Sequence, residues 1–477
     1  MRQLSEEQGP DLQTEIRRIW DLQTKKRWPL AQSTVAERRA RLKRLRAAIE
    51  KHRDAINEAV HRDFGKAPEE VDITETHLVM EELSLTLRSL ADWMRPQPVD
   101  APLLLAGTTS QVRQEAVGHV LVLGPFNYPF QLAVTPVIYA VAAGNVVVVK
   151  PSEKTPATSA MVRTILGEAF PEDEVAVLEG DARTAEALLE MPWDHIFFTG
   201  STVVGRKVMA AAAKHLSGVT LELGGKSPAV VDRSAQLEWA ARTIVYGKFI
   251  NAGQTCIAPD YVLVAEEQRD ALVGLLKTAV TDSYGAEPKA SPDYCRIIDD
   301  KAFNRLRGAI DATVRSGATV ALGGEHDPAT RYIAPTVLVD VPPDSEIMRE
   351  EIFGPVLPVL TYKTLEDAVQ LIRSQPHPLA LYVFARKRGA REQVLEGTSS
   401  GGACINTTVL HFANPELPFG GIGPSGVGNY HGRAGFLCFS HERSVLRQRG
   451  RPLSLFLAPP YKGRMNRLTA RIARWLE

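Results

Sequence analysis

The stretch NAGQTCIAPDY, residues 251–261, places Cys256 among small, turn-forming and polar residues. A structural thiol normally has apolar neighbours, so the stretch predicts an exposed loop between a helix and a strand. A thiol attacks as the thiolate, and a cysteine with the usual pKa of about 8.5 is only slightly ionised at pH 7. No acid in NAGQTC opposes that ionisation. A nucleophile and an ordinary loop cysteine fit these residues equally well, so the decision depends on partner residues.

Three other stretches offer such partners. Asn127 in LGPFNYPF follows an apolar run, where its amide can donate a hydrogen bond to a developing oxyanion; an asparagine in a proline-bracketed turn is the alternative. Glu222 in LELGGKSP lies in an apolar run before two glycines, and an apolar setting raises a carboxyl pKa, which suits a general base. In FFTGSTVVG, Gly200 leads to a helix N-terminus that can hold a phosphate.

The elements that must position these residues alternate between apolar runs and helices from about residue 118. Predicted strands are GHVLVLG, NVVVVK, VAVLEG, DHIFFTG and VTLELGG, separated by predicted helices such as FQLAVTPVIYAVAAG and STVVGRKVMAAAAKH. Strands that are apolar on both faces predict a parallel, doubly wound sheet, which binds ligands beyond the carboxyl ends of its strands. After GGKSP the alternation continues to about residue 405, which predicts a second α/β lobe and a cleft between the lobes.

A charged helical segment precedes this alternation. Thr34 and Glu37 have the spacing of a capping box, and Gly65 is placed to close the segment. Its basic run, ERRARLKRLR, is interpreted as the solvated face of a long amphipathic helix and not as a nucleic-acid arm.

The composition is that of an ordinary globular protein. The 477 residues include 56 basic and 56 acidic side chains, a balance that argues against a nucleic-acid surface. The amino-terminal residues lack a signal-peptide core, and no apolar run is long enough to span a bilayer. The four cysteines are too far apart for a metal or redox pair, so no metal is expected and a cytoplasmic location is predicted.

Seven motifs occur in an order that resembles the NAD(P)-dependent aldehyde dehydrogenase superfamily. They are GPFNYPF, KPSE, FTGSTVVG, ELGGKSP, GQTCIAPDY, EEIFGPV and LPFGGIGPSG, and the resemblance runs from about residue 30 to 445. PDYVLV and NYHGRAGFLCFSHERSV are similar to the class 3 branch, which includes enzymes for medium- and long-chain or aromatic aldehydes. The resemblance implies an α/β fold of two Rossmann-like lobes with doubly wound parallel sheets and a small β-rich bridging segment.

Position by position, the resemblance implies a catalytic role for three residues. Cys256 would attack the aldehyde to give a thiohemiacetal, and the amide of Asn127 with the backbone N–H of Cys256 would stabilise its oxyanion. Transfer of hydride to the nicotinamide would leave a thioester, which water activated by Glu222 would hydrolyse. A non-hydrolytic relative (CoA-acylating or phosphorylating) and a catalytically silent homologue are the alternatives; Glu222 argues against the first, and the presence of all three residues argues against the second.

The resemblance also implies NAD as the cofactor, with NADP accepted. The residues implied to bind it are Lys150, Glu153, Gly200, Ser201, Glu351 and Phe353. The chain departs from a frequent class 3 pattern at Val203, where glycine is common. The GxGxxG match at Gly421, Gly423 and Gly426 is not followed by a βαβ unit, so it is interpreted as a structural loop.

Substrate, assembly and membrane contact are predicted from weaker signals. The substrate entrance is assigned to Tyr128, Gln131, His411 and Phe412. The predicted domains are a cofactor-binding domain (1–95 and 117–224), a catalytic domain (225–409), a bridging segment that forms a homodimer (96–116 and 410–445), and a basic tail (446–477). The tail's Met465, Leu468, Ile472 and Trp475 recur at helical spacing beside arginines, so packing on the enzyme and peripheral binding to an anionic membrane both fit it.

Overall fold

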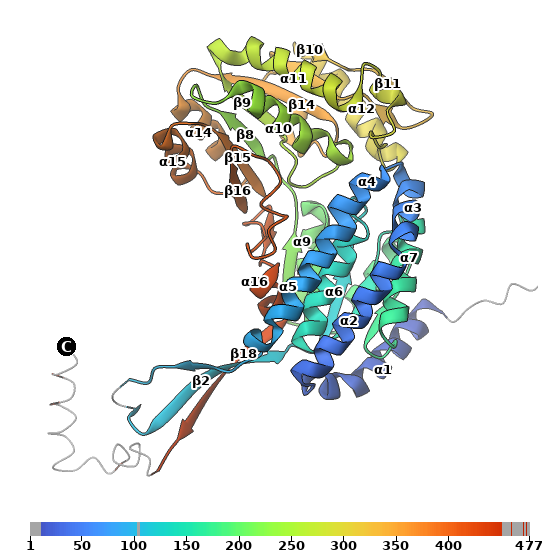
Figure 1. Cartoon of the computed structure of the whole chain (residues 1–477), viewed down its shortest axis with the longest axis vertical. Helices are drawn as coiled ribbons and strands as arrows, with labels where there is room; N and C mark the ends of the chain where they lie inside the picture. The colour runs from blue at the N-terminus through green and yellow to red at the C-terminus, as the bar shows by residue number, and fades with distance from the viewer. Residues whose placement is uncertain (1–10, 103–104, 451–458, 460–470, 472–473, 475–477) are drawn as a thin grey trace, which may run out of the picture.

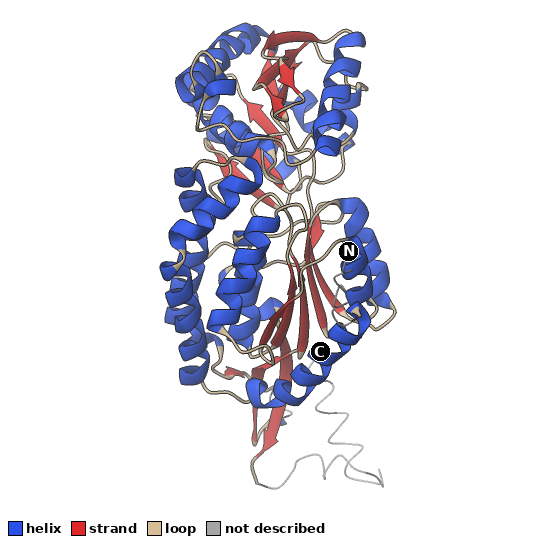
Figure 2. Cartoon of the chain, turned by 90° about the vertical axis from the view of Figure 1, so that its right-hand side faces the viewer, coloured by secondary structure: helices blue, strands red, loops and turns tan. Residues whose placement is uncertain are grey.

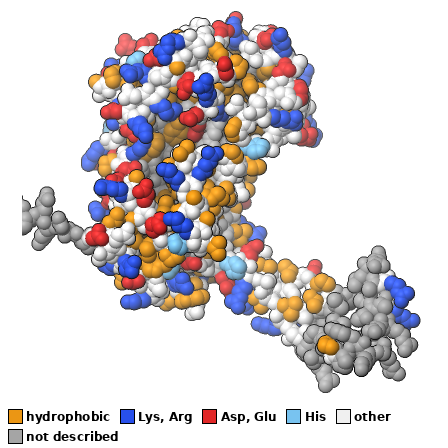
Figure 3. Space-filling view, turned by 180° about the vertical axis from the view of Figure 1, so that it is seen from behind, with side chains coloured by type: hydrophobic (Ala, Val, Ile, Leu, Met, Phe, Trp, Pro, Cys, Tyr) orange, Lys and Arg blue, Asp and Glu red, His pale blue; other side chains and the backbone are white. Residues whose placement is uncertain are grey.

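The computed structural model of the protein describes residues 11–102, 105–450, 459, 471 and 474. Two α/β lobes are stacked along the long axis, and a narrow arm of β-strands projects from the lower lobe (Figure 1). Basic and acidic side chains are interspersed over both lobes on the face drawn in Figure 3. Within the described ranges, no helix is long and apolar enough to cross a bilayer.

The first lobe is built on a six-stranded sheet in the order β17-β7-β6-β3-β4-β5. All neighbours are parallel except β17, which pairs antiparallel with β7 at the edge. Every residue of β3, β4 and β6 is buried, as the apolar runs predict, and the parallel sheet is confirmed. The strands are β3 (His119–Leu123), β4 (Val146–Lys150), β5 (Val175–Val177), β6 (His195–Thr199), β7 (Gly218–Glu222) and β17 (Gly426–Val427).

Helices cover both faces of this sheet (Figure 2). Val120 and Val122 of β3 pack into the core cluster that includes α6, whereas Leu121 and Leu123 pack into a separate cluster that includes α1. The predicted doubly wound arrangement is therefore confirmed. One face carries α2 (Val35–Lys51), α3 (Arg53–Phe64), α4 (Pro68–Val71), the π-helical turn η1 (Asp72–Thr76), α5 (His77–Trp93), α6 (Gln131–Ala143), α7 (Pro156–Ala169) and α16 (Gly432–Cys438); the other carries α1 (Leu12–Ala31), α8 (Ala182–Leu189) and α9 (Thr202–Ala213).

The predicted amino-terminal helical segment has the expected ends but an interruption. The capping box is formed, since Glu37 N donates to Thr34 Oγ1 and Thr34 N donates to Glu37 Oε2. Gly65 ends α3 in the left-handed conformation with φ 71°. The segment is nevertheless two helices, because His52 has non-helical angles of φ −103° and ψ 15°.

One arginine of the basic run is not on a solvated face. Arg38 is buried, and its guanidinium donates to the carbonyls of Ala31 and Ala142, at 2.8 and 2.9 Å, and to Ser33 Oγ. These carbonyls lie at the ends of α1 and α6, where no helical N–H reaches them. The prediction is therefore wrong at Arg38, which closes two helix ends.

The second lobe is built on a seven-stranded sheet in the order β10-β13-β14-β9-β8-β15-β16, parallel except at β10. Its strands are β8 (Pro228–Val231), β9 (Tyr261–Ala265), β10 (Thr319–Leu322), β13 (Thr336–Val339), β14 (Val356–Tyr362), β15 (Ala380–Phe384) and β16 (Gly402–Ile405). A separate pair comprises β11 (His326–Asp327) and β12 (Tyr332–Ile333). The helices are α10 (Leu237–Phe249), α11 (Arg269–Tyr284), α12 (Asp300–Arg315), α13 (Glu346–Arg349), α14 (Leu365–Ser374) and α15 (Arg388–Gly397). The predicted second α/β lobe is present.

The arm is a three-stranded antiparallel sheet of β1 (Gln97–Val99), β2 (Thr108–Ala116) and β18 (Ser440–Gln448). The segment predicted to bridge, 410–445, contributes to the arm only through its last residues. Before them, β17 joins the sheet of the first lobe and α16 packs on α5 and α6.

Candidate active site

A cleft between the lobes is bounded by opposite ends of the two sheets. In the first lobe it is lined by segments that follow β3, β4, β6 and β7, and in the second lobe by segments that precede β8, β9, β14 and β15. The cavity has a volume of about 830 Å³. The first lobe thus presents carboxyl ends, as predicted, whereas the second lobe presents amino ends. Nine of the predicted residues line this cavity: Asn127, Lys150, Glu153, Gly200, Ser201, Glu222, Cys256, Glu351 and Phe353.

Cys256 follows a tight turn, η3 (Ile250–Gly253), at the end of α10. Asn251 and Ala252 there have left-handed φ values of 54° and 50°. The predicted exposed loop is wrong, because residues 250–255 are buried. The polar side chains are inside because they satisfy backbone groups; Gln254 Nε2, for example, donates to the carbonyls of Asn251 and Arg296. Only the thiol end of the loop, at Cys256, reaches the cavity.

The protein groups around Cys256 oppose ionisation of its thiol. Burial raises the pKa of the thiol, and the carboxyl groups of Glu351 and Glu222 raise it further. The absence of an acid in NAGQTC was therefore an incomplete guide, since the opposing carboxyls come from two other segments. Thiolate formation in this cavity needs a compensating positive charge.

Glu222 ends β7 and faces the cavity from a buried position, 3% exposed. Burial raises its pKa well above the ordinary value, as its apolar run predicted. Neither carboxyl oxygen has a hydrogen-bond partner among the described residues. An unpartnered buried carboxyl has free lone pairs for a water molecule, as a general base requires.

Asn127 lies in the loop between β3 and α6 and is 3% exposed. Its backbone carbonyl accepts a hydrogen bond of 2.9 Å from Asn251 Nδ2, on the loop that carries the cysteine. The side-chain amide and the thiol therefore belong to two loops that are tied together, and both line the same cavity.

The candidate dinucleotide residues lie along the first-lobe wall. Lys150 Nζ donates to Glu153 Oε2 at 2.7 Å, and this interaction lowers the pKa of Glu153 although partial burial opposes the shift. Ser201 caps α9 by accepting from Val204 N, at the helix end that Gly200 leads into. Val203 is 67% exposed and lines the cavity on the first turn of α9. The open N-terminus of α9 fits a diphosphate.

Glu351 and Phe353 precede β14 and are held by a buried ion pair. Lys226 Nζ lies 2.5 Å from Asp260 Oδ2 and also donates to the carbonyl of Glu350, while Asp260 Oδ1 accepts from Ile352 N. Burial raises the pKa of Glu351 to about 8, and Asp260 adds to the shift. Sequence reasoning assigned no role to Lys226 or Asp260, although both stand in quoted motifs.

The four residues assigned to the substrate entrance do not line this cavity. Gln131 is buried and its amide lies 3.3 Å from Thr135 Oγ1 within α6. His411 pairs with Cys404 at 3.2 Å, and burial lowers its pKa to about 4. Phe412 packs edge-on against Phe419 and His431. Tyr128 hydrogen-bonds across to Thr255.

The GxGxxG match is a structural loop, as expected from its context. Gly426 lies in β17 and pairs with Glu222 of β7. A side chain at Gly421 would place its Cβ 2.1 Å from the carbonyl oxygen of Ser425. These glycines allow close backbone packing beside the carboxyl of Glu222, and their context is not that of the Rossmann fingerprint.

The aldehyde dehydrogenase family model matches residues 13–445. The chain belongs to the aldehyde dehydrogenase family. It is 42% identical to 4,4'-diaponeurosporen-aldehyde dehydrogenase of Staphylococcus aureus, over 91% of this chain and 94% of that protein. It is 44% identical to the dimeric, NADP-preferring aldehyde dehydrogenase of Rattus norvegicus, over 85% of this chain and 88% of the relative.

Solved structures of aldehyde dehydrogenases have the same fold as this chain. The substrate-bound state of Staphylococcus aureus AldH superposes with a TM-score of 0.92 at 40% identity, covering 96% of this chain and 99% of the other. An NAD⁺ complex of the Bacillus cereus aldehyde dehydrogenase superposes with a TM-score of 0.83 at 28% identity, covering 91% and 89%. This aldehyde dehydrogenase oxidises an aldehyde to the carboxylic acid with a nicotinamide cofactor.

Replacing Glu351 by glutamine is expected to speed alkylation of Cys256 by iodoacetamide above pH 8. The carboxyl of Glu351 ionises near that pH and then opposes the thiolate, so its removal lowers the pKa of the thiol. The rate is followed by mass spectrometry of the peptide containing Cys256. Glu153→Gln, which removes a carboxylate from the same cavity, should leave the pH profile unchanged. Identical profiles for Glu351→Gln and the wild type would show that burial alone sets the thiol pKa.

Proposed function

We propose that Cys256 is the nucleophile, that the Asn127 amide stabilises the oxyanion, and that Glu222 activates the hydrolytic water. The thiolate sulfur bonds to the aldehyde carbon, and the carbonyl oxygen becomes the oxyanion of a thiohemiacetal. When bound, the nicotinamide supplies the hydride acceptor, and a thioester on Cys256 remains. Glu222 then takes a proton from water as the hydroxide attacks the thioester carbon, releasing the acid and the thiol.

The observation that carries this proposal is the unpartnered, buried carboxyl of Glu222 in one cavity with Cys256. Burial raises the pKa of this carboxyl, which strengthens it as a base relative to an exposed glutamate. A CoA-acylating or phosphorylating relative has less use for such a group, so hydrolysis is the favoured fate of the thioester.

The proposed substrate is an apolar aldehyde, either medium- to long-chain aliphatic or aromatic. The support is the similarity to a protein named for 4,4'-diaponeurosporen-aldehyde. We infer no lining residues for it, because none of Gln131, His411 and Phe412 reaches the described cavity.

Nucleophile and base should be separable by mutation. Cys256→Ala is expected to abolish NADH production, whereas Glu222→Gln should retain a single-turnover burst and lose steady-state turnover, because water activation follows oxidation. Stopped-flow absorbance of NADH over a panel of straight-chain and aromatic aldehydes measures both. Cys438→Ala, which removes a thiol outside the cavity, is the matched control. Near-normal turnover by Cys256→Ala would contradict the mechanism, and a lost burst in Glu222→Gln would place Glu222 before oxidation.

Glu153 is proposed to favour NAD over NADP. Its carboxylate, 44% exposed and held by Lys150, would accept from ribose hydroxyls and repel a 2′-phosphate. Glu153→Ala is therefore expected to narrow the ratio of kcat/KM for the two cofactors. Glu179→Ala, which removes an acid of the same lobe outside the cavity, is the control. An unchanged ratio would mean that Lys150 governs the preference.

We propose that the chain forms a homodimer through the arm; the rat relative is named as dimeric. The strand β18 has one open edge, and Leu446 on it is 53% exposed. A projecting sheet with an unpaired edge strand and exposed apolar side chains is typical of a surface that binds another chain. The arm stands clear of the body in Figures 1 and 3.

Leu446→Lys is expected to weaken the dimer, because a charge would enter the proposed interface. Light scattering after size exclusion, over a dilution series, measures the mass. Leu216→Lys is the control, since Leu216 is 93% exposed on the first lobe, away from the arm. A monomeric wild type would refute the dimer, and an unchanged Leu446→Lys dimer would place the interface elsewhere.

The predicted membrane contact and packing of the tail fall on residues that lie almost wholly outside the described part of the chain, so both stay predictions, as does the cytoplasmic location. All four cysteines are free thiols, as the proposed reducing compartment requires.

A further inference from the structure

The residue after the oxyanion amide is hydrogen-bonded to the residue before the nucleophile. Tyr128 Oη lies 2.7 Å from Thr255 Oγ1. Tyr128 belongs to the first-lobe loop that carries Asn127, and Thr255 to the second-lobe loop that carries Cys256. One side-chain contact therefore joins the two loops through residues that are adjacent in sequence to Asn127 and Cys256.

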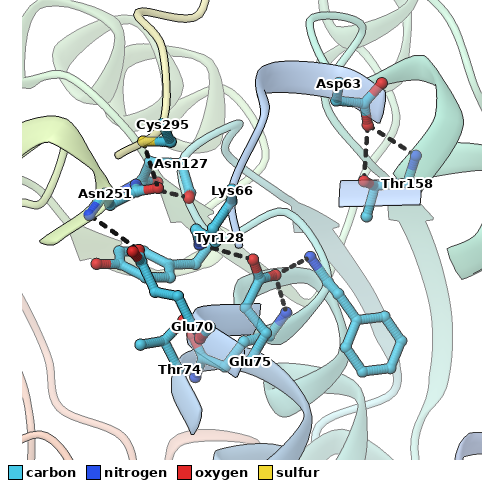
Figure 4. A network of polar contacts seen from close by, with 12 residues as sticks. Asp63, Lys66, Glu70, Thr74, Glu75, Asn127, Tyr128, Thr158, Asn251 and Cys295 are labelled. Carbon is cyan, nitrogen blue, oxygen red and sulfur yellow. Dashed lines mark hydrogen bonds and ion pairs between the residues drawn. The ribbon is translucent and has the colours of Figure 1, made fainter. Parts of the chain in front are cut away.

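The Tyr128 ring is itself held by a buried cation. Lys66 Nζ lies 4.1 Å from the ring centroid, and it also forms an ion pair of 2.9 Å with Glu75 in which both side chains are fully buried (Figure 4). Glu75 Oε2 in turn accepts from Phe130 N, at the start of α6. A buried ion pair is strongly destabilised if one partner leaves, so these groups hold the ring in one place.

A second contact supports the same alignment. Asn251 Nδ2 donates to the carbonyls of Asn127 and Gln254, and its backbone N–H donates to Glu70 Oε1 at 2.9 Å (Figure 4). The left-handed backbone at Asn251 is thus held from both sides. The contacts of Asn251 do not include Thr255, the residue that precedes Cys256. The hydrogen bond from Tyr128 reaches Thr255 directly.

We propose that Tyr128 is a positioning residue that aligns the Asn127 amide with the Cys256 sulfur through its hydrogen bond to Thr255. The inference rests on the proposed roles of Asn127 and Cys256. The hydroxyl is engaged by Thr255 and the ring by Lys66, whereas the assignment of Tyr128 to the substrate entrance stays a prediction. An oxyanion donor is effective only at the position that the oxygen occupies, so a small displacement of either loop costs rate and not binding.

The test removes the hydroxyl and leaves the ring. Tyr128→Phe is expected to lower kcat roughly tenfold with KM nearly unchanged, equivalent to one lost hydrogen bond of about 1.4 kcal/mol. Thr255→Val should give the same loss from the other side, and Thr255→Ser, which keeps an Oγ, should restore most of the activity. The double variant Tyr128→Phe/Thr255→Val should be no slower than either single variant, because both remove one contact.

A second cycle uses the Asn127→Ala background. If Tyr128 acts through the amide, Tyr128→Phe should cost little once the amide is gone. Additive losses would show that it does not act through Asn127 and overturn the proposal, as would a change in KM alone, which indicates a substrate contact. Failure of the proposed role of Asn127 can be told apart from failure of the Tyr128 proposal. If Asn127 is not the oxyanion donor, Asn127→Ala leaves kcat unchanged, whatever the effect of Tyr128→Phe. Circular dichroism melts of all variants verify that each is folded.

Discussion

The constraint on which the structure depends is the short passage from β7 to β8. Only five residues, from Leu223 to Ser227, separate the last strand of the first parallel sheet from the first strand of the second. So short a connection places the amino ends of the second sheet beside the carboxyl ends of the first. These two sets of strand ends therefore face each other across the cleft, and the loops at these ends line it. A side chain at Gly224 would place its Cβ 2.1 Å from Glu351 Oε2, so it would displace the carboxyl of Glu351 from the passage.

The same geometry determines the electrostatics. Three ionisable groups, Cys256, Glu222 and Glu351, line the same cavity, and each has its pKa raised, with burial as the main cause. Their common preference for the neutral form means that the cavity accommodates little negative charge. A positive charge close to these groups would favour the thiolate of Cys256.

Sequence reasoning found what local patterns encode. Apolar runs predicted both parallel sheets, and the motifs identified nine residues that share one cavity. It failed where a residue acts at long range. The sequence analysis assigned no role to Lys66 or Glu75, yet they form a fully buried ion pair, with Glu75 on the π-helical turn η1. The polar residues of NAGQTC predicted an exposed loop. The loop is buried because its polar side chains bond backbone groups that are distant in sequence, such as the carbonyl of Arg296. The amino-end orientation of the second lobe likewise follows from chain connectivity and not from any one strand.

The edge strand β17 and the helix α16 complete the first lobe with residues 426–438, after the whole second lobe has been made. The second lobe is therefore an insertion within the first, and its own sheet is continuous in sequence from Pro228 to Ile405. On a ribosome, we expect the inserted lobe to be able to collapse while the surrounding one is still missing an edge. Glu222 would stay uncovered at that edge until Gly426 pairs with it. The lobe whose synthesis begins first is thus the last to complete its sheet. Until then the unpaired edge of β7 is a surface on which a chaperone could act during synthesis.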